Sequence, residues 1–127
     1  MKPEIWLVED DEYLGELTRT VLEKRGFIVK TFINGQDVLT AMTMELPDLI
    51  ITDNFLPDQS GLEICRIVKS NPDTKHIPVI ITTGQLDCDE IESSPDDILK
   101  PDGCLIKPFD IENLIILIQK SLPGCKN

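Results

Sequence analysis

The stretch that decides the fold is residues 49–61, which read LIITDNFLPDQSG. A short, continuous apolar run such as LIIT is typical of a β-strand that is covered on both faces. The run ends at Asp53, and Pro57 and Gly61 in the following segment indicate a turn. A carboxylate at this point would lie at the mouth of a parallel sheet.

Working outward, similar apolar runs alternate with segments of helical period. The runs predict strands at 5–8, 27–32, 49–52, 79–82 and 104–106. The helical pattern predicts a first helix over about 12–25, with Gly26 as a left-handed cap, and further helices around 38–42, 62–68 and 114–122. Between residues 83 and 107 the pattern is weaker, and Pro95 predicts a short or irregular fourth helix.

Five βα repeats of this length favour an α/β fold in which helices cover both faces of a five-stranded parallel sheet. We expect a flavodoxin-like, doubly wound (βα)5 domain. Of the strand orders open to such a sheet, 2-1-3-4-5 makes the first and third strands neighbours and places ligands at their carboxyl ends. That order would bring Asp10 close to Asp53.

Composition narrows the class of protein. The chain has 127 residues, which predicts a single domain over 1–127. Its net charge of -11 argues against direct binding to nucleic acid or to an anionic membrane. No apolar run approaches ~18 residues, and the first residues lack the apolar core of a signal peptide. We therefore expect a cytoplasmic protein whose four cysteines, which show no CxxC spacing, are reduced.

The predicted strand ends carry complementary chemistry. Glu9 and Asp10 follow the first strand, Asp53 ends the third, Thr83 follows the fourth, and Lys107 follows the fifth. Three carboxylates about 4 Å apart would repel one another by about 4 kcal/mol per pair at an effective dielectric near 20. A divalent cation would offset that repulsion, and Mg²⁺ prefers carboxylate oxygens. The lysine ammonium and the threonine hydroxyl suit the oxygens of a phosphoryl group.

These motifs together resemble the receiver domain of two-component response regulators. The resemblance covers the chain from about residue 5 to 122. It rests on the motifs Val8-Glu9-Asp10-Asp11, Asp53-x-x-Leu56-Pro57-x-x-x-Gly61, Thr83-Gly84 and Lys107-Pro108-Phe109. Each motif alone is weak, whereas all four in this order at strand ends are a strong signal.

The resemblance implies a role for each residue. Asp53 would be the phosphoacceptor, and Lys107 and Thr83 would contact the phosphoryl group. Glu9 and Asp10 would be the acidic pair, with Mg²⁺ held by Asp10, Asp53 and the backbone carbonyl of Phe55. The donor would be a phosphohistidine on a sensor histidine kinase or a histidine phosphotransfer protein, and the downstream protein target is not specified. The Lys107–Pro108 bond would be cis.

The chain departs from the family pattern in three places. The family usually has an aromatic residue three positions before the lysine, where this chain has Cys104. The usual Ala-Gly-Ala-Asp-Gly stretch reads LKPDG at 99–103, and the fourth-helix region is two residues longer than expected and carries Pro95. All three lie on the side that such domains commonly use for output.

Other functions are open to a fold of this kind. An Asp-nucleophile phosphatase would need a second Asp where Phe55 stands, and a flavin carrier would need a phosphate loop where residues 9–12 are acidic. A degenerate receiver that acts as a phosphorylation-independent scaffold is the main alternative. We expect no enzyme activity beyond Mg-dependent phosphorylation and dephosphorylation of the chain itself, and no catalytic role for His76. The chain is either a single-domain regulator or a piece of a longer one.

Overall fold

The computed structural model describes residues 2–84, 88 and 100–122. Within them the strands are β1 (Glu4–Val8), β2 (Ile28–Phe32), β3 (Leu49–Asp53), β4 (Val79–Thr83) and β5 (Gly103–Ile106). The helices are α1 (Glu12–Lys24), α2 (Gly35–Ala41), α3 (Gly61–Ser70) and α5 (Ile111–Ser121). Apart from Cys88, the segment predicted to form a fourth helix lies outside the described residues.

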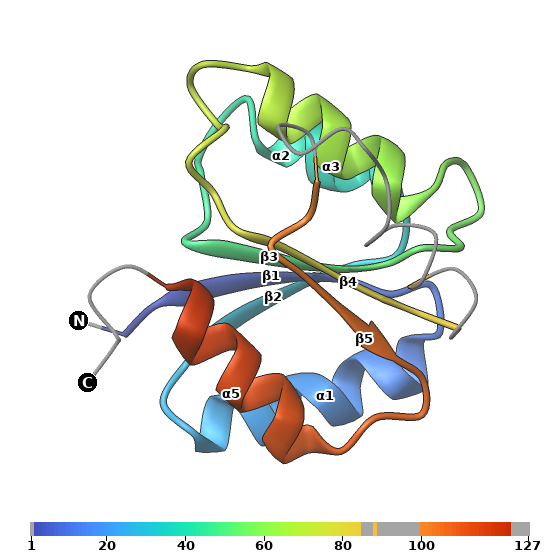
Figure 1. The fold of residues 1–127 in the computed structure, drawn as a ribbon, viewed down its shortest axis with the longest axis vertical. Coiled ribbons are helices and arrows are strands. Elements are labelled where there is room, and N and C mark those ends of the chain that lie inside the picture. The colour runs from blue at the N-terminus through green and yellow to red at the C-terminus, as the bar shows by residue number, and fades with distance from the viewer. Residues whose placement is uncertain (1, 85–87, 89–99, 123–127) are drawn as a thin grey trace.

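All five strands are parallel and follow the order β2-β1-β3-β4-β5. The predicted strand order is therefore confirmed. Because β1 lies beside β3, with Val8 opposite Thr52, the segments that follow these two strands leave the sheet side by side. Figure 1 shows the sheet between two layers of helices, with α2 and α3 on one face and α1 and α5 on the other.

The alternation of side chains along each strand builds a hydrophobic core on each face of the sheet. In β1, Ile5 and Leu7 pack in the core beneath α1 and α5, while Trp6 and Val8 pack in the core beneath α2 and α3. Among the described residues the buried polar side chains are four threonines, which explains why the strands read as nearly continuous apolar runs. The sheet is thus a rigid platform for the residues at its carboxyl edge.

Local sequence signals fix where the helices begin and end. The Asp11 side chain accepts hydrogen bonds from the backbone N–H groups of Tyr13 and Leu14 and so caps the start of α1. Gly26 follows α1 with a φ of +95°, in the left-handed region where glycine avoids a steric penalty. Ser60 and Glu63 form a reciprocal capping box at the start of α3.

The expectation of reduced cysteines is wrong for two of the four. Cys88 and Cys104 form a disulfide, with their Cα atoms 5.7 Å apart, whereas Cys65 is a buried thiol. Pairing of β5 with β4 brings Cys104 close to the segment that follows β4, and a separation of 16 residues in sequence gives no hint of that proximity. Cys125 lies outside the described residues.

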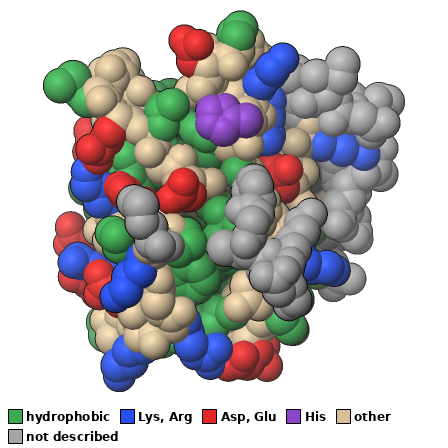
Figure 2. Space-filling model, turned by 90° about the vertical axis from the view of Figure 1, so that its left-hand side faces the viewer, with side chains coloured by type: hydrophobic (Ala, Val, Ile, Leu, Met, Phe, Trp, Pro, Cys, Tyr) green, Lys and Arg blue, Asp and Glu red, His purple; other side chains and the backbone are tan. Residues whose placement is uncertain are grey.

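Figure 2 shows the end of the molecule at which the strands begin, where acidic and basic side chains are interspersed around hydrophobic ones. His76, the one histidine of the sequence, precedes the first residue of β4 and so lies at this end, away from the carboxyl edge of the sheet. Among the described residues, no helix has the length and apolar character needed to cross a bilayer.

Candidate functional site

Three carboxylates converge where β1 and β3 end. Glu9 and Asp10 follow β1, Asp53 is the last residue of β3, and carboxylate oxygens of the three lie within 4.8 Å of one another. At that separation and an effective dielectric near 20, each pair of full negative charges repels by about 3.5 kcal/mol. The repulsion predicted from the sequence is therefore present in the folded chain, and positive charge is needed to offset it.

Lys107 supplies part of that positive charge. Its Nζ donates to Glu9 Oε1 at 3.0 Å and to Asp53 Oδ2 at 3.1 Å. The side chains of Glu9 and Asp53 are only 11% and 12% exposed, so water and salt screen these ion pairs less than they screen pairs on the surface. The contact between Lys107 and Glu9 was not anticipated from the sequence, which indicated only that both residues lie at strand ends.

Burial and pairing oppose each other in the titration of this cluster. Burial alone would lower the pKa of Lys107, but hydrogen bonds to Glu9 and Asp53 outweigh it and raise the pKa above its ordinary value. Burial raises the pKa of Glu9, although its hydrogen bond to Lys107 acts in the opposite direction. Lys107 is therefore held firmly in its charged form at neutral pH.

The cluster has the donor set that a divalent cation requires. Three carboxylates and one ammonium leave two negative charges uncompensated, which matches the charge of Mg²⁺. Asp10 is exposed, so at least one ligand faces solvent, and Mg²⁺ in proteins usually retains several waters. Hard carboxylate oxygens without sulfur or imidazole favour Mg²⁺ over softer metals. The residues thus fit the ion that the sequence predicts.

Thr83 is joined to Lys107 through the backbone. Thr83 is the last residue of β4 and is only 2% exposed. The N–H of Lys107 donates to the carbonyl of Thr83 at 2.8 Å, which fixes the end of β5 against the end of β4. The Lys107–Pro108 peptide bond is cis, as the family resemblance implied. Both residues predicted to contact a phosphoryl group therefore leave the same edge of the sheet.

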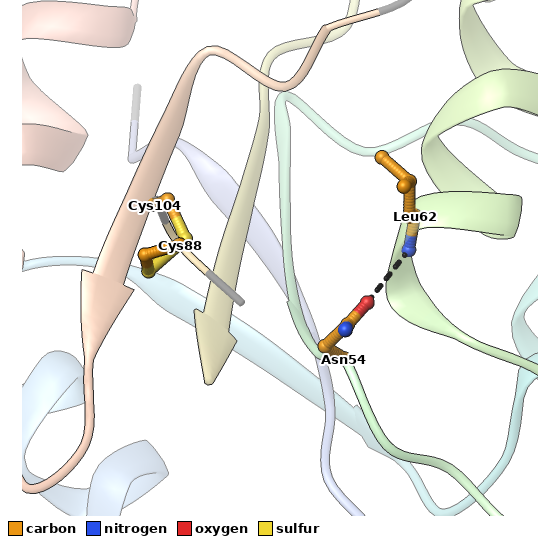
Figure 3. Close-up of a disulfide and its surroundings, with 4 residues drawn as sticks. All are labelled: Asn54, Leu62, Cys88 and Cys104. Carbon is orange, nitrogen blue, oxygen red and sulfur yellow. Dashed lines mark hydrogen bonds between the residues drawn. A yellow bond between two sulfur atoms is a disulfide. The ribbon is translucent and has the colours of Figure 1, made fainter. Parts of the chain in front are cut away.

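The loop between β3 and α3 is held by its own hydrogen bonds. The Asn54 side chain accepts from the N–H of Leu62 at 3.1 Å, and its carbonyl accepts from the N–H of Gly61 at 2.9 Å. Figure 3 shows the first of these bonds closing the loop. The N–H of Phe55 donates to Asp53 Oδ1 at 3.4 Å, while the Phe55 residue is 65% exposed. The loop therefore orients the Asp53 carboxylate.

Sequence reasoning missed the part played by Asp58. Its carboxylate accepts hydrogen bonds from the N–H groups of Gly35 and Gln36, at 2.9 and 2.8 Å, and so caps the first turn of α2. The hydrogen bond from Gly35 is the main cause of a lowered pKa for Asp58. No local signal could have revealed this contact, because the two segments are more than 20 residues apart in the sequence.

The fold and the family resemblance agree with what known proteins show. Residues 5–119 match the response regulator receiver domain family, so the chain belongs to that family. In sequence it is 35% identical over 126 residues to the phosphate regulon transcriptional regulatory protein PhoB of Rhizobium meliloti (strain 1021), which covers 99% of this chain and 55% of that protein. The chain spans about half or less of the length of the first curated relatives it matches.

Solved structures support the same assignment. The signal receiver domain of a signal transduction histidine kinase from Syntrophus aciditrophicus superposes with a TM-score of 0.83 at 30% identity, covering 98% of this chain and 93% of that one. A response regulator receiver domain protein from Clostridium thermocellum superposes with a TM-score of 0.82 at 28% identity, covering 94% and 93% of the two chains. The fold and the class of signalling domain are thus those predicted from the sequence.

Proposed function

We propose that this chain is the phosphoacceptor domain of a two-component phosphorelay, with Asp53 as the acceptor. The observation that carries the proposal is the position of Lys107, whose ammonium contacts Asp53 and Glu9 inside a cluster of three carboxylates. The donor would be a phosphohistidine on a sensor histidine kinase or a histidine phosphotransfer protein. Phosphorylation would then change the affinity of the domain for a downstream protein.

Each residue has a role that its chemistry supports. A carboxylate oxygen of Asp53 attacks the phosphorus, the P–N bond of the donor imidazole breaks, and the released nitrogen takes a proton from solvent. Lys107 and the Thr83 hydroxyl stabilise the charge on the phosphoryl oxygens. Asp10, Asp53 and the Phe55 carbonyl would hold Mg²⁺ beside Glu9. When bound, the ion would supply the positive charge that lets two anionic groups approach each other.

The alternatives are less well supported. A phosphatase needs a general acid near the nucleophile, and the position two residues after Asp53 holds the apolar Phe55, which is largely exposed. A scaffold that does without phosphorylation has no need to keep Lys107 paired with two partly buried carboxylates. We therefore propose one receiver domain over 1–127 that works in the cytoplasm. It would phosphorylate and dephosphorylate only itself, contacting proteins rather than nucleic acid or membrane.

Labelling with a small phosphodonor tests the proposal. Incubation with acetyl phosphate and Mg²⁺ should add one phosphoryl group to the intact protein, as measured by mass spectrometry, and removal of Mg²⁺ should abolish the addition. Asp53→Asn should not be labelled. Asp58→Asn is the matched control, since it removes a carboxylate from the same loop that lies outside the cluster, and it should be labelled. Labelling of Asp53→Asn would refute the assignment.

A further inference from the structure

The disulfide joins the two chain segments that carry the phosphoryl-contacting residues. Cys88 is 1% exposed, and its N–H donates to the carbonyl of Gly84, the residue that follows β4, at 3.1 Å. Cys104 is in β5, directly opposite Ile81 of β4. Figure 3 shows the bridge between Cys88 and Cys104 lying beside β5. The disulfide therefore joins β5 covalently to Cys88, a residue that follows β4 in the chain.

The disulfide is part of a closed ring of chain that includes Thr83 and Lys107. Thr83 lies five residues before Cys88, and Lys107 lies three residues after Cys104. The ring is completed on the other side by the hydrogen bond from the N–H of Lys107 to the carbonyl of Thr83, at 2.8 Å. Any displacement of Thr83 relative to Lys107 must therefore be accommodated by a ring that the disulfide closes.

The pair also differs chemically from Cys65, the other cysteine in the part of the chain that the structure describes. Cys65 of α3 belongs to the same hydrophobic core against which Cys104 packs. Burial raises the pKa of Cys65 to about 12, so at neutral pH it is almost entirely the unreactive thiol. Of the two bonded residues, Cys88 is buried and Cys104 is half-buried. Oxidation and reduction would then affect this pair without exchange onto Cys65.

We propose that Cys88 and Cys104 form a reversible redox switch that controls how readily Asp53 accepts and responds to a phosphoryl group. The inference rests on the proposed phosphoacceptor function. In the oxidising direction, the two thiols react with a small-molecule disulfide. One S–S bond forms in the protein, the S–S bond of the reagent breaks to give two thiols, and two electrons and two protons pass to the reagent.

The direction of the effect follows from the contacts at the site. In the unphosphorylated chain, Lys107 Nζ contacts Asp53 Oδ2. When that carboxylate gains a phosphoryl group, the ammonium must move from Oδ2 to the oxygens of the phosphoryl group. The Thr83 hydroxyl must also meet those oxygens from β4. Any backbone movement that accompanies these adjustments changes the relative positions of the two segments that the disulfide ties together. The oxidised form therefore resists the phosphorylated arrangement, and reduction removes the restraint.

The test compares one protein in two redox states. Wild-type protein is equilibrated with oxidised or with reduced glutathione, the excess reagent is removed, and the disulfide content is measured by thiol alkylation and mass spectrometry. The initial rate of labelling by acetyl phosphate and Mg²⁺ is then measured for each form. The reduced form should be labelled at least about fivefold faster, the lower end of typical coupling between sites. Amide exchange in 79–84 and 103–107 should also change more on labelling.

Variants separate the redox effect from other causes. The double variant Cys88→Ser/Cys104→Ser should match the reduced wild type in both redox buffers. Cys65→Ala is the control, because it removes a cysteine from the same core but leaves the pair intact, and it should keep the redox difference. Equal labelling rates in the two wild-type forms, or the absence of a disulfide in oxidised glutathione, would overturn the switch alone. Absence of labelling in both forms would overturn the phosphoacceptor function and the switch with it.

Discussion

Gly61 is the residue whose replacement tests most sharply how the fold positions Asp53. A Cβ atom added at Gly61 would lie 2.7 Å from the backbone carbonyl oxygen of Asp53, 3.0 Å from Thr52 Cγ2 and 3.2 Å from the Cα atom of Asn54. Two of these three neighbours are backbone atoms at the end of β3, which cannot rotate away. Gly61→Ala must therefore push the first turn of α3 away from the strand that carries the acceptor.

The size of the effect follows from two opposing contributions. Overpacking a tight contact costs about 1–3 kcal/mol, while replacing glycine by alanine in a helix gains at most about 1 kcal/mol. We expect Gly61→Ala to lower the free energy of unfolding by about 1–2 kcal/mol. Because the displaced atoms belong to Asp53 and its neighbour, labelling by acetyl phosphate should also slow several-fold.

Gly15 in α1 provides the matched control. A Cβ atom there would lie 3.8 Å from Glu9 Cβ, an ordinary van der Waals distance, so Gly15→Ala should keep only the helix gain of up to about 1 kcal/mol. Urea denaturation of both variants gives the free energies, and intact-mass spectrometry gives the labelling rates. A Gly61→Ala protein as stable and as readily labelled as Gly15→Ala would show that the close approach at Gly61 does not position the acceptor.

Three further outcomes are expected. Millimolar Mg²⁺ should raise the melting temperature by relieving carboxylate repulsion, and the rise should shrink in Asp10→Asn; an undiminished rise would place the ion elsewhere. Phosphorylated Phe55→Asn should hydrolyse faster than phosphorylated wild type, because the apolar ring shields the acyl phosphate from in-line water; equal rates would remove that role from Phe55. The free energy of unfolding should fall by about 1.4 kcal/mol per pH unit as the pH rises from about 9 towards 12. Burial raises the pKa of the Cys65 thiol to about 12 in the folded chain, so over this range the thiol ionises in the unfolded chain but not in the folded one. Cys65→Ala should lose this part of the pH dependence in urea denaturation, and an unchanged slope would contradict it.

The five strands were predictable from local patterns, whereas their order was taken from known doubly wound folds. Each strand is covered on both faces, so its sequence is a continuous apolar run, and parallel pairing then places every strand end at one edge. That geometry is why the positions of Glu9, Asp10 and Asp53 in the sequence, once the strand order is given, were enough to predict that the three carboxylates converge. The helix caps at Asp11 and Gly26 were predictable for a similar reason, because each depends on residues only a few positions away.

Contacts between distant segments were not predictable in the same way. The disulfide between Cys88 and Cys104, the cap that Asp58 provides for α2 and the ion pair between Lys107 and Glu9 all join residues from different βα units. Cysteine spacing and loop acids carry no signal for such contacts until the strand register is known.

The most direct test of the central claim is to locate the phosphoryl group chemically. After labelling with acetyl phosphate and Mg²⁺, borohydride reduces an aspartyl phosphate to homoserine, and peptide mass spectrometry identifies the position of that homoserine. We predict homoserine at position 53 and at no other carboxylate, with the signal absent from protein labelled without Mg²⁺. Homoserine at Asp10 or Asp58 with residue 53 unchanged, or no homoserine in a protein that carries phosphate, would contradict the assignment of Asp53 as the phosphoacceptor.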